Sequence, residues 1–137
     1  MRTFQDTTII KQLIFKYRDA FNAADTSAIV TLYAPNGVLM PNNAPSATGA
    51  AELTKSFDSL LKNFQISIEY FIDEINGTED YAFARTNSKV NTLITANGER
   101  IFLVNKELFV FIKLNSEWKI AQYIFNNTST KKDAPII

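Results

Sequence analysis

The chain has 137 residues, no cysteine and no histidine, and its 14 basic and 14 acidic residues give a formal net charge of zero. The two missing residue types exclude disulfides, thiolate catalysis, His-ligated metal sites and Ser–His triads. Because no run of basic residues occurs, we expect neither nucleic acid nor a membrane surface as a partner. We also expect no metal and no cofactor.

The composition is that of one soluble domain, with 46% hydrophobic and 20% charged residues. The N-terminal stretch Met1–Asp6 lacks the apolar run of a signal peptide, so we expect a cytoplasmic protein. We predict a single domain over residues 1–137, with an ordered core of about 6–127 and a loose tail over 128–137.

The first predicted element is a long amphipathic helix that Asp6, Thr7 or Thr8 can cap. Its apolar positions recur at spacings of three and four, which forms one helical stripe. The stripe consists of Ile10, Leu13, Ile14, Tyr17, Phe21 and Ala24. Thr26 or Ser27 can cap a second, shorter helix, which Pro35-Asn36-Gly37 ends.

A short apolar strand is predicted at Val38–Met40, and a loop rich in proline and small polar residues follows at Pro41–Gly49. The next segment has the apolar spacing of a third helix. Its inner face is predicted to carry Leu53, Phe57, Leu60, Leu61 and Phe64.

The remaining chain has the pattern of β-strands. Residues 66–72 alternate between apolar and polar side chains, and Asn76-Gly77 and Asn97-Gly98 are typical hairpin turns. Longer strands are predicted at about 81–95, 99–114 and 117–126. The predicted fold is therefore α+β: a helix–helix–strand–helix order followed by four strands, with the helices packed on a curved antiparallel sheet.

Several segments of this pattern resemble the nuclear transport factor 2-like superfamily, and within it the small SnoaL-like and ketosteroid-isomerase-like bacterial proteins. The matching segments are Tyr17–Asp25, Leu32–Ala34, Val38–Pro41, Gly49, Asp80–Ala82, Trp118–Ala121 and Phe125-Asn126. The resemblance implies a conical, cystatin-like fold with a cavity between sheet and helices, and a homodimer packed through the sheets. It does not select a reaction, because relatives include isomerases, cyclases, dehydratases and binding domains.

The resemblance also implies positions for catalytic groups. In the isomerases, a Tyr on the first helix binds a steroid oxygen, and Tyr17 falls at that position. The carboxylate base would fall at Pro41, with Asn42 and Asn43 beside it, and the second acid at about Val110. Amides and proline cannot take a proton at neutral pH, so steroid-type isomerisation is disfavoured. Tyr17 can equally line a pocket or belong to the core.

Two further sets of side chains are candidates for chemistry. Alternation places Phe83, Arg85 and Asn87 on one face of a strand. The resemblance implies that this face corresponds to the one that lines the pocket in the isomerases. Arg85, with Lys106, could then meet an acidic group on a ligand, or the same face could be exposed or lie at the dimer interface. Glu107 is the best candidate for a general base if its face proves to be the cavity.

The sequence thus favours a small-molecule-binding domain with a partly apolar pocket. The alternatives are a cofactor-independent SnoaL-like enzyme acting on a small hydrophobic substrate, with Tyr17 and Glu107 as candidates, and a structural module whose cavity is filled. The predicted ligand-binding residues are Tyr17, Phe21, Tyr33, Met40, Phe57, Leu61, Phe83, Arg85, Asn87, Lys106, Leu108 and Phe125.

Overall fold

The computed structural model describes residues 4–132, with side chains described as far as residue 128. Its helices are α1 (Thr7–Asn22), α2 (Thr26–Val30) and α3 (Gly49–Asn63). Its strands are β1 (Tyr33–Met40), β2 (Ala47–Thr48), β3 (Phe64–Gly77), β4 (Tyr81–Ile94), β5 (Arg100–Leu114) and β6 (Glu117–Lys132).

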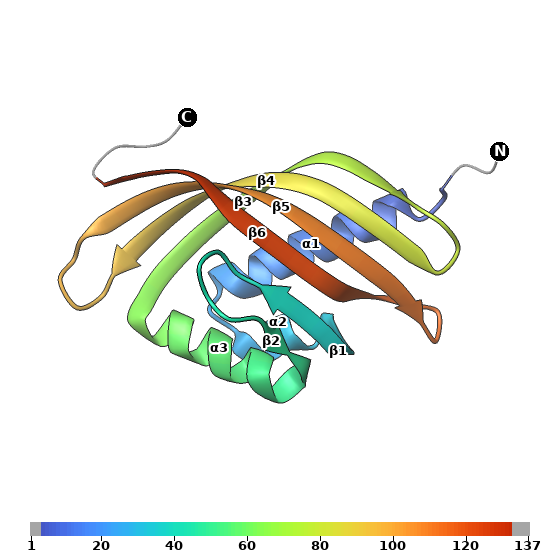
Figure 1. Cartoon of the computed structure of the whole chain (residues 1–137), viewed down its shortest axis with the longest axis horizontal. Coiled ribbons are helices and arrows are strands. Elements are labelled where there is room, and N and C mark those ends of the chain that lie inside the picture. The colour runs from blue at the N-terminus through green and yellow to red at the C-terminus, as the bar shows by residue number, and fades with distance from the viewer. Residues whose placement is uncertain (1–3, 133–137) are drawn as a thin grey trace.

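The strands form one curved sheet in the order β2-β1-β6-β5-β4-β3. The long strands β3 to β6 pair as an antiparallel meander, whereas β1 runs parallel to β6, so the sheet is mixed rather than purely antiparallel. Figure 1 shows the long strands bending over α1, with α2 and α3 on the same side of the sheet. The predicted α+β architecture and its element order are confirmed, with the short strand β2 added.

Several predicted boundaries shift because sheet pairing overrides local turn signals. The segment Pro35-Asn36-Gly37 lies inside β1, where the pairing with β6 changes register between Tyr33 and Val38. Strand β6 continues past the predicted end at residue 126 because it pairs with β5 as far as Lys132. Residues 128–132 are therefore strand rather than loose tail, and residues 133–137 of the predicted tail lie outside the described part of the chain.

The helix caps differ in detail from the prediction. Asp25, not Thr26 or Ser27, caps α2 by accepting a hydrogen bond from the Ala28 backbone N–H at 3.1 Å. Asp6 precedes α1 but makes no side-chain cap. Its carboxylate instead accepts hydrogen bonds from Trp118 Nε1 at 2.8 Å and from Lys113 Nζ at 3.3 Å. Asp6 thereby links the start of the chain to the β5–β6 hairpin.

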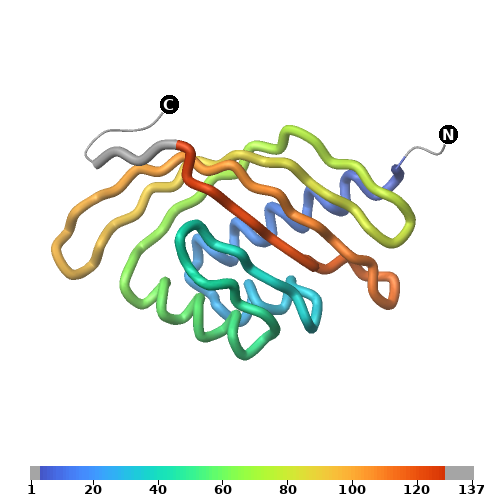
Figure 2. Tube along the Cα trace, viewed as in Figure 1, coloured from blue at the N-terminus to red at the C-terminus, as the bar shows by residue number. Residues whose placement is uncertain are grey.

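The core lies between α1 and the concave face of the sheet. The predicted stripe of α1 is buried at Ile10, Leu13, Ile14 and Tyr17, and α1 packs mainly against β3. The trace in Figure 2 follows α1 along the inside of the curved strands. Each apolar side chain that is buried in this way stabilises the fold by about 1.5–3 kcal/mol.

Asn22, at the last turn of α1, joins the helix to the edge strand β3. Its amide Nδ2 donates to the Ile68 carbonyl at 2.9 Å, and the Ile68 backbone N–H donates to Asn22 Oδ1 at 2.8 Å. Edge strands leave backbone groups without a ladder partner, and this side chain satisfies both groups of Ile68.

We predict that Asn22→Ala lowers the free energy of unfolding by about 1–3 kcal/mol, because both backbone groups of Ile68 lose their partner. Urea denaturation followed by circular dichroism measures this loss. Ser67→Ala, at an exposed position of the same strand, is the control and should leave the midpoint unchanged. Equal urea midpoints for Asn22→Ala and wild type would contradict this prediction, because water would then satisfy the two Ile68 backbone groups without a loss of stability.

Candidate functional site

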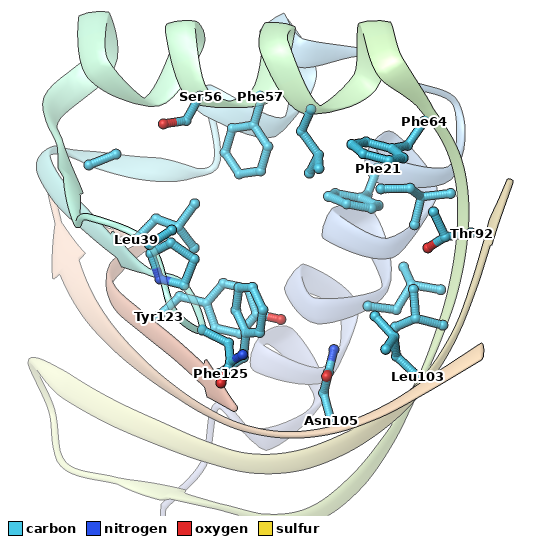
Figure 3. Close-up of a pocket in the computed structure, with 18 of the residues that line it drawn as sticks. Phe21, Leu39, Ser56, Phe57, Phe64, Thr92, Leu103, Asn105, Tyr123 and Phe125 are labelled. Atoms are coloured by element: carbon cyan, nitrogen blue, oxygen red, sulfur yellow. The ribbon is translucent and has the colours of Figure 1, made fainter. Parts of the chain in front are cut away.

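A cavity of about 820 Å³ lies between the concave face of the sheet, helices α1 and α3, and the loop before β2. Figure 3 shows side chains from the sheet, α1 and α3 pointing into it. This volume is within the range of small-molecule sites in proteins, about 300–1,000 Å³. The aromatic side chains that line it are Tyr17, Phe21, Phe57, Phe64, Tyr70, Tyr123 and Phe125. The aliphatic ones include Leu39, Leu60, Ile66, Ile68, Val90, Ile101 and Leu103.

Polar lining side chains gather where the cavity meets solvent. Ser46, Glu52, Lys55 and Ser56 line the cavity and are themselves exposed. Glu52 is already engaged, because its Oε1 accepts a hydrogen bond from the Thr48 backbone N–H at 2.8 Å. This edge is therefore polar while the interior is apolar, an arrangement suited to an apolar ligand that enters from water.

Tyr17 is the centre of the aromatic wall. It is 1% exposed, and its ring contacts six other rings at centroid distances of 5.4–6.5 Å. These rings come from α1, β1, α3, β3, β5 and β6, and belong to Phe21, Tyr33, Phe57, Tyr70, Phe109 and Tyr123. Tyr17 therefore lines the cavity and also forms part of the core.

The buried tyrosines pair through their hydroxyl groups. Tyr17 Oη lies 2.8 Å from Tyr33 Oη, and Tyr70 Oη lies 2.6 Å from Tyr123 Oη. Burial raises the pKa of all four phenols, since an ionised phenolate would lose its hydration. The four hydroxyls therefore stay protonated at neutral pH, and each already has a tyrosine partner.

Glu107 lies on the concave face of β5 and is 4% exposed. Thr86 Oγ1 donates to its Oε1 at 2.7 Å, and Ser88 Oγ donates to its Oε2. Burial raises the pKa of the Glu107 carboxyl, while the two hydroxyl donors lower it by a smaller amount. Glu107 is not among the residues that line the cavity. Glu107 thus lies on the concave face, which was the condition for its candidacy as a base, but its carboxyl is directed at Thr86 and Ser88.

Asn105 lies two residues before Glu107 on the same face of β5 and lines the cavity. It is 5% exposed, and its Oδ1 is buried without a hydrogen-bond donor among the described residues. A buried acceptor without a partner costs about 1–3 kcal/mol, so it calls for a physical explanation. The sequence offered no signal for Asn105 beyond its position in an alternating strand.

The predicted site residues fall into three groups. Four of them, Tyr17, Phe21, Phe57 and Phe125, line the cavity together. Tyr33 does not line the cavity but lies behind Tyr17, and the two hydroxyls are hydrogen-bonded. Met40 and Leu61 do not line the cavity, and their sequence neighbours Leu39 and Leu60 take that place.

The third group faces away from the cavity. The prediction that the face of β4 with Arg85 lines the pocket is therefore wrong. The concave face of β4 carries small, buried side chains, namely Ala82, Ala84, Thr86, Ser88 and Val90. The alternate positions lie on the outer face of β4 or of its partner β5, and they are Phe83, Arg85, Asn87, Lys106 and Leu108.

On the outer face, Arg85 has a side chain that is 58% exposed and lies 3.6 Å from Asp73 and 3.7 Å from Glu74. Asn87 donates to Asp73 at 3.2 Å. These polar groups stay in water, because an unpaired guanidinium in the apolar cavity would lose its hydration. Arg85 and Lys106 therefore do not meet an acidic group of a ligand in the cavity.

The positions that correspond to the isomerase acids are also without a carboxyl group. Pro41 and Asn42 line the cavity, Asn43 is exposed with a backbone φ of 55°, and Val110 pairs with Phe83 of the outer face. The described residues contain no group of three or more potential metal ligands. None of the described helices has the length and apolar character needed to cross a membrane.

Residues 14–123 match the family model of the SnoaL-like domain. The chain belongs to this family. Solved structures place the SnoaL-like fold in the nuclear transport factor 2-like superfamily, as predicted. No protein with a curated description matches the chain.

Three solved structures illustrate the likeness of this SnoaL-like domain. A ketosteroid isomerase-like protein from Erwinia carotovora atroseptica is 28% identical, with a TM-score of 0.86 over 91% of this chain and 98% of that one. An NTF2-like protein with a cystatin-like fold from Novosphingobium aromaticivorans is 19% identical, with a TM-score of 0.71 over 90% of this chain and 82% of that one. A hexachlorocyclohexane dehydrochlorinase is 8% identical, with a TM-score of 0.79 over 93% of this chain and 88% of that one.

Glu107 gives a test of the electrostatics of the concave face of the sheet beside the cavity. Because folding raises its pKa above the ordinary value of 4.5, its contribution to stability is present below that pH and is lost as the pH rises through the folded-state pKa. Glu107→Gln removes this titration while keeping the shape. We predict that the variant gains stability relative to wild type as the pH rises from 4.5 to 8. Urea denaturation of both proteins across this range measures the difference, and a constant difference would contradict the raised pKa.

Proposed function

We propose that this SnoaL-like domain binds a small, largely apolar molecule in the cavity between its sheet and its helices. The observation that carries the proposal is the open space of about 820 Å³ behind a polar edge, with aromatic and aliphatic side chains around it. Burial of apolar ligand surface against these side chains supplies the driving force, at about 25 cal/mol per Å² removed from water.

The open cavity argues against the third predicted alternative, a structural module whose cone is filled. Protein interiors normally pack to the density of organic crystals, and an empty apolar space costs free energy in proportion to its volume. A ligand that occupies the space restores those contacts. The dehydrochlorinase relative is named for hexachlorocyclohexane, an apolar molecule, which supports a ligand of this class for the same fold.

The geometry favours binding over turnover. An acid–base catalyst must reach the reacting atom within hydrogen-bond distance. Glu107 is the one buried carboxyl on the described concave face, but it accepts hydrogen bonds from Thr86 and Ser88 and does not line the cavity. The hydroxyl of Tyr17 is likewise paired with Tyr33. The cofactor-independent enzyme therefore remains the second candidate, with Glu107 as the group that favours it.

A bulky substitution inside the cavity tests the proposal. Ser56 projects from α3 toward the cavity and is exposed, so Ser56→Trp should fold and place an indole in the ligand space (Figure 3). The neutral fluorophore 1-aminoanthracene is a suitable probe. We predict that wild type enhances its fluorescence on titration and that Ser56→Trp weakens the binding at least about tenfold, since apolar contacts are replaced by a clash.

Ser59→Trp is the matched control for this test. It adds the same side chain to α3 at an exposed position that does not line the cavity, so it should bind the probe as wild type does. Equal weakening by both variants, or no binding to wild type, would contradict the proposed cavity.

We also propose that the domain forms a homodimer through the outer face of its sheet. Leu108 and Ile124 are direct cross-strand partners on that face, and they are 40% and 38% exposed. The exposed charges of Arg85, opposite Leu108 on β4, and of Lys106, two residues before Leu108 on β5, lie beside this apolar pair. An apolar centre with a polar rim is the usual composition of an interface, and a two-fold axis lets one patch meet its own copy.

Ile124→Glu tests the dimer, because a charge in the centre of the interface would be buried without a partner. We predict that light scattering after size-exclusion chromatography gives twice the mass of one chain for wild type and the mass of one chain for Ile124→Glu. Ile9→Glu is the control, since Ile9 is 50% exposed on α1 and lies away from the patch. A wild type that elutes as a monomer at all concentrations would contradict the interface.

A further inference from the structure

The side-chain amide of Asn105 presents its nitrogen to the cavity. Asn105 lines the cavity from β5 and is 5% exposed. Figure 3 shows the amide nitrogen at the end of the side chain that points into the enclosed space. The oxygen of the same amide is shut off within the protein. The orientation that encloses the oxygen is therefore also the one that turns the nitrogen toward the cavity.

Asn105 Nδ2 has no hydrogen-bond acceptor among the described residues. The cross-strand partners of Asn105 are Ser88 and Asn127, and neither accepts a hydrogen bond from it. The nearest carboxylate along the strand is that of Glu107, whose two oxygens accept from Thr86 and Ser88. Since native structures rarely leave an enclosed donor without an acceptor, this amide N–H is available to a bound molecule.

A second unused proton donor belongs to the same row of the sheet. Tyr70 and Asn105 lie on either side of Ser88, because Tyr70 pairs with Ser88 and Ser88 pairs with Asn105. The Tyr70 hydroxyl is 2.6 Å from that of Tyr123, and both tyrosines line the cavity. Two hydroxyls carry two protons and the bond between them uses one, so this pair keeps one O–H without an acceptor in the described part of the chain.

We infer that Asn105 determines the specificity of the cavity by donating from Nδ2 to an oxygen of the ligand, and that the ligand is a neutral, largely apolar carbonyl compound. This inference rests on the proposed function. A carbonyl fits the site because its oxygen has two lone pairs and no proton. It accepts from the Asn105 amide and leaves a lone pair for the phenol pair beside it.

The ligand is neutral because the charged side chains of the cavity lie at its edge. Glu52 and Lys55 are the two charged residues that line it, and both are exposed. A carboxylate bound at Asn105 would lose its hydration without a cation to replace it, and a buried charge without a partner is costly.

A matched pair of ligands separates the acceptor oxygen from the apolar body. The compounds 2-acetylnaphthalene and 2-isopropenylnaphthalene have nearly the same shape, but only the ketone has an oxygen. Displacement of 1-aminoanthracene gives the affinity of each. We predict that Asn105→Leu lowers the ratio of ketone affinity to hydrocarbon affinity at least about tenfold relative to wild type, because the bound carbonyl loses its donor. The comparison of ratios cancels the different hydration of the two compounds, since both proteins are titrated in the same water.

Thr92→Val is the matched control variant. Thr92 also lines the cavity, is 8% exposed and loses only its hydroxyl in the substitution, so the ratio should stay within about threefold of the wild-type value. A ratio that Asn105→Leu leaves unchanged, or that Thr92→Val lowers equally, would overturn the assignment to Asn105. Tighter binding of 2-naphthoate than of 2-acetylnaphthalene by wild type would overturn the neutral class.

A measurement on wild type covers the case in which Asn105→Leu does not fold. In protein labelled with ¹⁵N-asparagine, the side-chain N–H signals of Asn105 should move further downfield with 2-acetylnaphthalene than with 2-isopropenylnaphthalene. Equal shifts with the two compounds would overturn the inference. Binding of 1-aminoanthracene that is blocked by Ser56→Trp would then show that the proposed function still stands, whereas its absence would remove both.

Discussion

The contact of Tyr17 with its six surrounding rings is the interaction on which the rest of the structure depends. It joins the long helix to four strands and to α3, so that elements distant in the sequence converge on one side chain. Aromatic pairs of this geometry contribute about 0.5–1.5 kcal/mol each beyond the burial of their area. The hydrogen bond between the Tyr17 and Tyr33 hydroxyls also sets the orientation of the Tyr17 ring, because it holds the hydroxyl end of that ring against β1.

The same cluster sets the limit of the cavity. On one side of Tyr17 the stacked rings of Phe109 and Phe111 are fully buried in the core. On the other side the rings of Phe21, Phe57 and Phe125 enclose open space. The transition from filled core to cavity therefore occurs along one helix. It explains why a residue that reads as core in the sequence also forms a wall of the site.

The polar side chains on the concave face of the sheet impose a second constraint. Because they are buried, each of them needs a hydrogen-bond partner within the protein. Glu107 is tolerated there because two hydroxyls donate to it, and the tyrosines form pairs among themselves. Asn105 is the exception in this otherwise satisfied set. Native structures leave few buried polar atoms without a partner, so Asn105 is unusual among the side chains of this face.

Much of the architecture could be predicted from the sequence. The stripe on α1 has a period of 3.6 residues, and the alternation after residue 64 has a period of two, so element types and their order followed from local patterns. The end of β6 could not be predicted in this way. Residues 128–132 carry the polar composition of a tail, and only pairing with β5 keeps them extended.

The sequence by itself determined the fold family, the apolar stripe of the amphipathic helices and the absence of the isomerase carboxylates at Pro41 and Asn42. The tertiary structure alone decided which strand face lines the cavity. Alternation divides a strand into two faces without saying which is inside, and the charged face of Arg85 proved to be outside. Register shifts near Asn105 and Val110 of β5 and after Ile72 of β3 change the parity of the pairing. Because such bulges arise from packing between strands, no local pattern could place Asn105 at the floor of the site.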